Sequence, residues 1–222
     1  KRNLGQDIPM LLNFLPSVVT TSDAGAGIGY TGIRVRGVSS QSTNVTINGI
    51  PYTDAESLGT FWVNLGDFSS SVENLQLQRG VGTSTNGSGA FGASINILTD
   101  AVSREASGEV SNSFGSFNSR KHTVKFSTGL MGADAERSRG IEIAGRLSNI
   151  ESDGYVDRAS SSLKSYFLQG SYVDDNTLIK AVTFGGNNVT YQSWFGIDAT
   201  TLRENRTFNP AGAYEDENGN QQ

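Results

Sequence analysis

The feature that most constrains the fold of this chain is a two-residue alternation of side-chain character through its second half. In residues 123–130, 141–148 and 166–172, apolar and small residues alternate with mostly polar ones. A period of two places each set on one face of a β-strand. Together with residues 107–117 and 177–194, these segments predict about five strands. Each is close to the roughly 9–11 residues that a tilted membrane-spanning strand needs.

The connections between these segments bear on the kind of sheet they form. Residues 173–177 are a short polar connection, whereas residues 150–162 and the stretch after Tyr191 are long. Short turns at one end and long loops at the other are typical of outer-membrane barrels. No run of about 18 apolar residues could form a transmembrane helix. Because a soluble antiparallel sheet also alternates, the pattern alone leaves both kinds of sheet open.

Residues 1–100 have a different character, with short segments separated by glycine-rich loops. Residues 6–15 predict a short helix that Asp7 caps and Pro16 ends, and Asp67 is a second candidate cap, for a turn over 68–72. The expected strands are 33–37, 73–80 and 93–98, and 44–52 is an expected hairpin. These features predict a small α/β unit over residues 1–100, followed by antiparallel strands over 101–222.

Composition excludes several kinds of chemistry. The chain has no cysteine, which removes disulfides, thiolate metal sites and cysteine nucleophiles. His122 is the single histidine, too few for a histidine metal cluster, and no serine-nucleophile motif accompanies it. The net charge is −5 and neither half is basic, which argues against nucleic-acid binding. We therefore expect no enzyme, no catalytic residue, no bound metal and no cofactor.

The glycine-rich stretch after Arg79 contains an apparent nucleotide-binding motif. Residues 87–92, GSGAFG, match G-x-G-x-x-G. A dinucleotide site needs this motif to open a helix, whose N-terminus faces the pyrophosphate. Here the motif opens residues 93–98, ASINIL, which predict a strand. The glycines are thus expected to let a long loop bend without Cβ clashes.

Several ordered segments of the first half together resemble one protein family. They are LLNFLPSVV (11–19), IRVRG (33–37), NVTINGIPY (44–52) and VENLQLQRGVGTSTNGSGAFGASINILT (72–99). In this order they resemble the plug domain of TonB-dependent outer-membrane receptors, over about residues 4–100. Residues 107–191 resemble the first barrel strands that follow such a plug.

The resemblance is not complete. Val81 stands where the family usually has proline after Arg-Gly, and Asn86 stands where tyrosine is common. Ala93 and Ser94 replace a glycine and its neighbour. These departures leave open what the upper loops of the plug contact.

The resemblance implies a fold and a function. The fold is an N-terminal α/β plug domain, residues 1–100, followed by antiparallel strands of a transmembrane β-barrel, residues 101–222. Such barrels have 22 strands in the full protein. The implied function is outer-membrane uptake of a scarce nutrient, such as a siderophore, a cobalamin, a glycan or a peptide. The TonB–ExbB–ExbD complex supplies the energy, outer-membrane lipid surrounds the barrel, and a surface lipoprotein is a further possible partner.

The resemblance also assigns two sets of residues. The first set belongs to the plug motifs, with the arginines contacting the barrel wall or neighbouring plug residues: Arg34, Arg36, Gly37, Asn48, Gly49, Arg79, Gly80, Gly87, Gly92 and Asn96. The second set faces the substrate from plug and extracellular loops: Tyr52, Thr53, Asp54, Thr85, Asn86, Tyr155, Trp194 and Phe195.

Two alternatives from other functional classes stay open. One is an outer-membrane adhesin or surface assembly protein without transport, and the other is a soluble β-rich binding module. Five strands cannot close a membrane barrel, since bacterial barrels have at least about eight. We therefore expect this chain to be the N-terminal portion of a longer receptor, with the energising segment upstream of Lys1.

Overall fold

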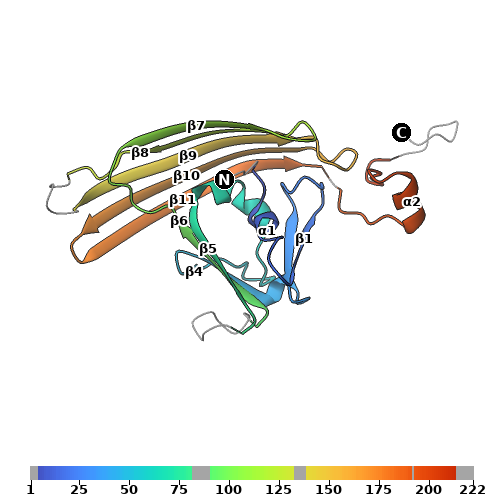
Figure 1. Ribbon diagram of the computed structural model, residues 1–222, viewed down its shortest axis with the longest axis horizontal. Coiled ribbons are helices and arrows are strands. Elements are labelled where there is room, and N and C mark those ends of the chain that lie inside the picture. Colours follow the sequence, from blue (N-terminus) through green and yellow to red (C-terminus); the bar gives the residue numbers. More distant parts are fainter. Residues whose placement is uncertain (1–4, 82–90, 133–138, 192, 214–222) are drawn as a thin grey trace.

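The computed structural model of the chain describes residues 5–81, 91–132, 139–191 and 193–213. Figure 1 shows two parts: five long strands form one curved sheet, and the N-terminal elements lie together against one face of it. Among the described residues, no helix is both long enough and apolar enough to cross a membrane.

The N-terminal part is built of short elements around a small apolar core. They are α1 (Ile8–Leu11), β1 (Val18–Ser22), β2 (Thr31–Val35), η1 (Ser40–Ser42), β3 (Thr43–Ile47), β4 (Ile50–Pro51), η2 (Trp62–Leu65), η3 (Phe68–Ser71), β5 (Val72–Arg79) and β6 (Ala93–Thr99). Strands β1 and β2 form one antiparallel pair, and the other four form a sheet in the order β4-β3-β6-β5. Val35, Val45, Ile95, Ile97 and Phe68 are buried in the core between them.

The curved sheet is a simple antiparallel meander. Its strands are β7 (Ser107–Phe114), β8 (Arg120–Ser127), β9 (Gly140–Ser152), β10 (Ser161–Asp174) and β11 (Thr177–Thr190), and α2 (Ala199–Glu204) follows. Each strand pairs with its neighbours in sequence, so the order is β11-β10-β9-β8-β7. The prediction of about five strands from residue 107 onward is confirmed.

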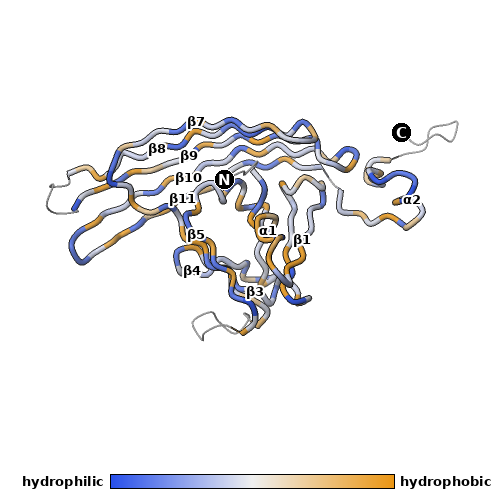
Figure 2. The backbone as a smooth tube through the Cα atoms, viewed as in Figure 1, coloured by the Kyte–Doolittle hydropathy of each residue, from blue (hydrophilic) through white to orange (hydrophobic). Residues whose placement is uncertain are grey.

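Burial separates the two faces of this sheet, and Figure 2 shows the hydropathy alternating along its strands. On β10, Leu163, Phe167 and Gln169 are buried against the N-terminal part, whereas Tyr166 and Leu168 are exposed on the other side. The face toward the N-terminal part is here called the inner face, and the opposite one the outer face. The outer face carries these exposed apolar side chains: Val110, Val124, Phe126, Ile141, Ile143, Leu147, Tyr166, Leu168, Tyr172 and Ile179.

Local predictions in the first half hold well where turn chemistry decides the backbone. Asn48 and Gly49 have φ of 51° and 82° and join β3 to antiparallel β4, as a type I′ hairpin requires. Residues 93–98 lie in strand β6, so the glycine-rich stretch leads into a strand and not a helix. Ile33 and Val35 share the buried face of β2, as expected.

The predicted helix over 6–15 is mostly wrong: α1 has four residues, Ile8–Leu11. Asp7 occupies the N-cap position but makes no capping hydrogen bond, because its carboxylate accepts one from the hydroxyl of Thr31 at 2.9 Å. Asp67 makes no capping bond either. In both cases a partner distant in sequence takes the carboxylate that local pattern assigned to a cap.

Loop length does not separate the two ends of the sheet as simply as predicted. Residues 175–176 join β10 to β11 at one end, but the connection from β8 to β9 at that same end spans 128–139. The opposite end holds the connections 115–119 and 153–160. This second end, where β9 joins β10, is here called the loop end.

Candidate functional site

The two parts meet at a buried ionic cluster centred on Asp67. Its carboxylate lies 2.6 Å from the Lys121 ammonium of β8 and 2.6 Å from the Arg146 guanidinium of β9. Hydroxyl groups of Ser70 and Ser148 donate to it as well, at 2.7 Å and 2.5 Å. All three charged side chains are at most 5% exposed. The carboxylate is thus fully partnered, and both of these cations come from the curved sheet.

The backbone of Asp67 explains why this residue reaches the sheet. It adopts a left-handed conformation, with φ of 50°, which Asp tolerates better than most residues. Gly66, just before it, packs so closely on Leu163 of β10 that a Cβ there would clash with that side chain. A buried charge left without its partner costs several kcal/mol. Separating the two parts would leave these charges without their partners, so the cluster stabilises the contact between the parts.

A second set of polar contacts joins β6 and the segment after it to the same inner face. The hydroxyl of Thr99 donates to Gln169 at 3.0 Å. Asp100 pairs with Lys125 at 2.5 Å, and its carbonyl accepts a hydrogen bond from Lys180 at 3.0 Å. These contacts and the Asp67 cluster hold the N-terminal part to four of the five strands.

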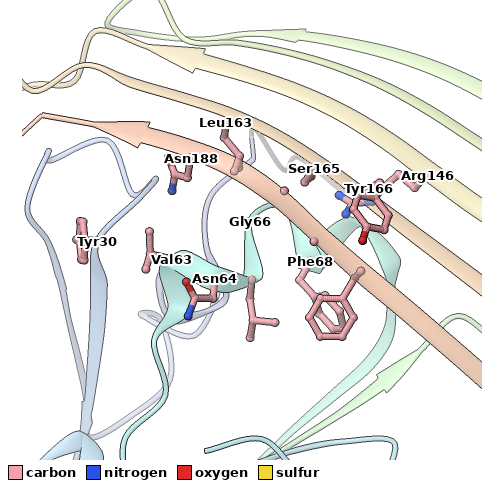
Figure 3. Close-up of a pocket in the computed structure, with 14 residues that line it drawn as sticks. Tyr30, Val63, Asn64, Gly66, Phe68, Arg146, Leu163, Ser165, Tyr166 and Asn188 are labelled. Carbon is pink, nitrogen blue, oxygen red and sulfur yellow. The ribbon is translucent and has the colours of Figure 1, made fainter. Parts of the chain in front are cut away.

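A polar cavity of about 410 Å³ lies beside the Asp67 cluster, between η2 and strands β9–β11 (Figure 3). In Figure 3, Asn64 points into it from η2 and Asn188 from β11. The hydroxyl of Ser165 and the Nε of Arg146 are buried there, and neither finds a hydrogen-bond partner among the described residues. Buried groups of this kind are usually satisfied by water. The interface is therefore partly polar and not sealed by side chains alone.

Aromatic side chains gather at the loop end of the sheet. Tyr30, just before β2, packs edge-on against Trp194 at 5.8 Å between ring centroids, and Trp194 lies 6.4 Å from Phe195. Phe117 and Tyr155 form a second edge-on pair at 5.6 Å. All five rings are between 38% and 54% exposed. These five residues are here called the end aromatic group.

Backbone contacts tie this group to the N-terminal part. The amide of Tyr155 donates to the carbonyl of Ala24 at 2.9 Å, and Gly25 lies against the Tyr155 side chain. The loop 23–30 thus touches loops of the curved sheet. Exposed rings of this kind supply a large contact area to a ligand with little entropy loss. The arrangement therefore presents exposed ring surface at the contact between this loop and the curved sheet.

The carboxyl of Asp7 is buried close to the ionic cluster. Burial raises its pKa to about 8, against a hydrogen bond from Thr31 that lowers it, and the charge of Asp67 raises it further. Asp7 is therefore mostly protonated at neutral pH. Its neighbour Gly5 packs on Ile150 of β9, where a Cβ would clash. The start of the described chain is thus held inside the interface.

The plug arginines do not reach the inner face of the five strands. Arg79 donates to the carbonyl of Pro16 at 3.0 Å, a neighbour within the N-terminal part. The Arg36 guanidinium lies beside Gly80, and Arg34 is exposed. In the part of the chain that the structure describes, none of the three makes an ion pair. The ionic contacts that exist there place the carboxylates of Asp67 and Asp100 on the N-terminal part and the cations on the sheet.

Several predicted motif residues have clear structural roles. Asn96 accepts a hydrogen bond from Thr46 across β6 and β3 at 2.8 Å, and Asn48 bonds Thr99 at 3.0 Å. Gly37 and Gly80 have φ of 74° and 86°. At Gly92 a Cβ would lie 2.8 Å from the Ser42 carbonyl oxygen, so only glycine fits without a shift. Gly87 lies outside the described residues.

The structure divides the predicted substrate-facing residues. Tyr155, Trp194 and Phe195 all lie at the loop end, where Tyr155 packs on Phe117, and Trp194 lies next to Phe195 and Tyr30. Tyr52 instead packs against Phe184, near the middle of β11, at 6.0 Å between ring centroids, so it lies apart from them. Asp54 is exposed, but backbone amides of its own turn donate to it and hold the pKa of its carboxyl below the usual value. Thr53 is exposed beside it, and Thr85 and Asn86 lie outside the described residues.

Sequence reasoning missed Lys121, Arg146 and Ser148 as partners of Asp67, and Tyr30 and Phe117 as members of the aromatic group. A charged residue at an inward-facing strand position was a signal for the first set. Nothing local distinguishes Tyr30, because its partner Trp194 lies more than 160 residues away in sequence.

Comparisons with known proteins agree with this architecture. Residues 1–94 match the family model described as the TonB-dependent Receptor Plug Domain. The chain is similar to the ferric enterobactin receptor of Pseudomonas aeruginosa, with 23% identity over 167 residues, which cover 70% of this chain and 22% of the receptor.

Solved structures show the same fold over most of the chain. The copper transporter OprC superposes with a TM-score of 0.68 at 16% identity, covering 85% of this chain and 29% of that one. The ferric citrate transporter FecA, in its unliganded form, gives 0.67 at 17% identity, covering 92% and 32%. This chain therefore spans less than a third of the length of these proteins. Residues 1–94 are thus similar to the plug domains of TonB-dependent receptors, and the chain as a whole shares the fold of these solved transporters: a plug followed by antiparallel strands.

Proposed function

We propose that the chain is the plug and the first barrel strands of an active-transport receptor in the outer membrane of a Gram-negative cell. The receptor binds a scarce nutrient at the loop end and imports it with energy from the TonB–ExbB–ExbD complex. The observation that carries this proposal is the inverted character of the curved sheet. Its inner face is polar and joined to the plug by the Asp67 cluster, while its outer face is apolar and exposed.

The dimensions of the outer face support a membrane location. Lys164 and Asp174 bound its apolar stretch on β10 and stand ten residues apart. At about 3.4 Å per residue this is about 34 Å along the strand. A tilt of about 40° reduces it to roughly 25 Å, the height of the apolar band of outer-membrane barrels.

The substrate is proposed from the end aromatic group and from the relatives. Proteins similar to this chain are named for a ferric siderophore, ferric citrate or copper. An iron chelate or another metal complex is therefore the first candidate, ahead of a cobalamin, a glycan or a peptide. Tyr30 of the plug and Trp194 of the segment after β11 would contact it together, so a bound ligand would touch both parts.

This arrangement gives the ligand a way to influence the plug. The loop 23–30 carries Tyr30, and its Gly27 carbonyl accepts a hydrogen bond from the Asp7 amide at 2.9 Å. Movement of this loop would therefore reach the N-terminal segment, on which the energising partner is expected to pull. A surface lipoprotein is a further proposed partner at the loop end.

The experiment is an uptake assay with the full-length receptor in a strain that lacks it. Radiolabelled ferric siderophores, cobalamin and oligosaccharides are offered in turn, with and without a functional TonB. We expect TonB-dependent uptake of one compound, and a loss of its binding by about tenfold or more in a Tyr30→Ala, Trp194→Ala double variant. Phe14→Ala, at a 91% exposed aromatic outside the group, is the matched control.

Two results would contradict the proposal. A receptor that fractionates without detergent as a soluble protein would favour a soluble binding module. A receptor that sits in the outer membrane but transports none of the compounds, with or without TonB, would favour an adhesin or surface assembly protein.

A further inference from the structure

The outer face of the curved sheet changes character along its strands. Strand register aligns Tyr166, Leu147, Val124 and Val110 in one apolar row across β10, β9, β8 and β7. The next row toward the loop end aligns Lys164, Asn149, His122 and Asn112. A single step along the strands therefore exchanges four apolar side chains for four polar ones.

A groove of about 700 Å³ lies at this boundary and is lined by both rows. Val124 and Leu147, on its apolar side, are 48% and 62% exposed. Asn149, on its polar side, is half-buried. The groove thus combines an open apolar floor with a polar edge.

The charge on this edge is positive. Lys164 is exposed and makes no ion pair with any described residue. The nearby carboxylate of Glu151 is already engaged by Arg120 at 3.0 Å. His122 donates through Nδ1 to Asn112 Oδ1 at 2.6 Å, which holds the ring in place beside the groove. An unpaired cation next to an apolar floor suits an amphiphile with an anionic head.

We propose that this groove binds a phosphate-bearing lipid of the outer membrane. Its acyl chain lies over Val110, Val124, Leu147 and Tyr166, and its phosphate lies at Lys164, beside His122 and Asn149. This proposal rests on the proposed membrane location and adds a lipid site that the transport function does not require. Positive charge at an interface attracts anionic headgroups, and removing one such cation weakens the attraction about fivefold.

The test uses the full-length receptor, extracted from outer membranes in mild detergent. Native mass spectrometry and phosphorus analysis measure the phosphate-bearing lipid retained per receptor. We expect Lys164→Gln to lower the retained lipid about fivefold, and Lys164→Glu to lower it further by repulsion. Arg203→Gln, at an exposed cation of α2 away from the groove, is the matched control and should retain the wild-type amount. Leu147→Asn tests the apolar floor and should also reduce retention.

Nutrient uptake separates a failure of this proposal from a failure of the proposed function. If the receptor transports its nutrient but Lys164→Gln and Lys164→Glu retain the wild-type amount of lipid, the lipid site is wrong and the transport function stands. A transporting wild type that retains no such lipid also overturns the site. A protein that does not enter the outer membrane overturns both.

Discussion

The two faces of the curved sheet follow opposite rules. The outer face exposes Leu147, Tyr166 and Leu168, each more than 40% accessible, whereas the inner face buries Lys121 and Arg146 almost completely. A soluble protein would reverse this, because water favours exposed charges and buried apolar groups. The difference teaches that each face meets a different environment: the outer face requires an apolar one, and the inner face replaces water with the groups of the plug.

The inner face depends most on one charge, so its removal should have the largest effect. Asp67→Asn retains a residue that tolerates the left-handed backbone but leaves Lys121 and Arg146 buried without their anion. We expect the free energy that holds the folded plug against the curved sheet to fall by about 3–5 kcal/mol. Denaturant-dependent proteolysis of the plug in the full-length receptor measures this change. Asp54→Asn is the control, because Asp54 is exposed and bonds only its own turn. Equal protease resistance of Asp67→Asn and wild type would contradict the importance of the cluster.

The outer face should reject charge in a way that depends on depth. Leu168→Arg, in the middle of the apolar stretch, should destabilise the receptor by about 2–4 kcal/mol in lipid vesicles. Ser162→Arg faces the same side nearer the loop end and should cost no more than about 1 kcal/mol. Urea unfolding in vesicles measures both. Similar losses for the two variants would mean that the outer face does not contact the membrane interior.

Asp7 should make the inner side of the molecule sensitive to pH. Its pKa is raised from 3.8 to about 8, so the folded plug binds a proton that the unfolded chain releases. The stability that this proton supplies is complete below about pH 4 and declines as the pH rises toward 8. The slope should reach at most about 1.4 kcal/mol per pH unit. Asp7→Asn, which still accepts from Thr31, should remove this slope in melting experiments between pH 5 and 9. If the Asp7→Asn variant kept the same dependence of stability on pH, another titrating group would be its cause.

Substitutions at two serines of the inner face should have the smallest effects on stability. They compare a hydroxyl that donates to Asp67 with one that has no partner among the described residues. Ser148 donates to Asp67, so Ser148→Ala should cost about 1.5–3 kcal/mol, the usual value for a hydrogen bond to a charged group. The hydroxyl of Ser165 has no partner in the described part of the chain, so Ser165→Ala should change stability by less than about 0.5 kcal/mol. The melting temperatures of the two variants measure this difference. Equal losses of stability in the two variants would mean that the hydrogen bond from Ser148 to Asp67 adds nothing beyond the burial of a hydroxyl group.

Local sequence patterns predicted the strands well and the helix badly. Alternation in 141–148 and 166–172 marked the outer face correctly, because a strand shows two different environments to successive residues. The helix at 6–15 shrank to Ile8–Leu11, since tertiary contacts outweigh helix propensity in so short a segment. The caps expected at Asp7 and Asp67 failed for a related reason: each carboxylate found a distant partner.

The candidate site was only partly predictable. The resemblance placed Tyr155, Trp194 and Phe195 among substrate-facing residues, and the structure places all three at the loop end, in two separate sets of ring contacts. The structure also shows that Tyr52 packs against Phe184 of β11 and that Tyr30 belongs to the end aromatic group. Both positions depend on partners distant in sequence, so local sequence could not predict them. The contact between Tyr30 and Trp194 joins the beginning of the chain to its end, and only the packing of the plug under the sheet creates it.

By itself, the sequence determined the secondary structure of most strands, the Asn48–Gly49 hairpin, the two-part organisation and the resemblance to plug domains, although it did not indicate β1. These depend on side-chain period, on residues that accept positive φ and on ordered motifs, all of which act over a few residues. Only the tertiary structure decided which charges meet. Asp67, Lys121 and Arg146 are ordinary charges in sequence, and they form one buried cluster because the fold removes water from all three at one point. Burial is a property of the whole arrangement, so the pairing that compensates it cannot be seen before the parts are assembled.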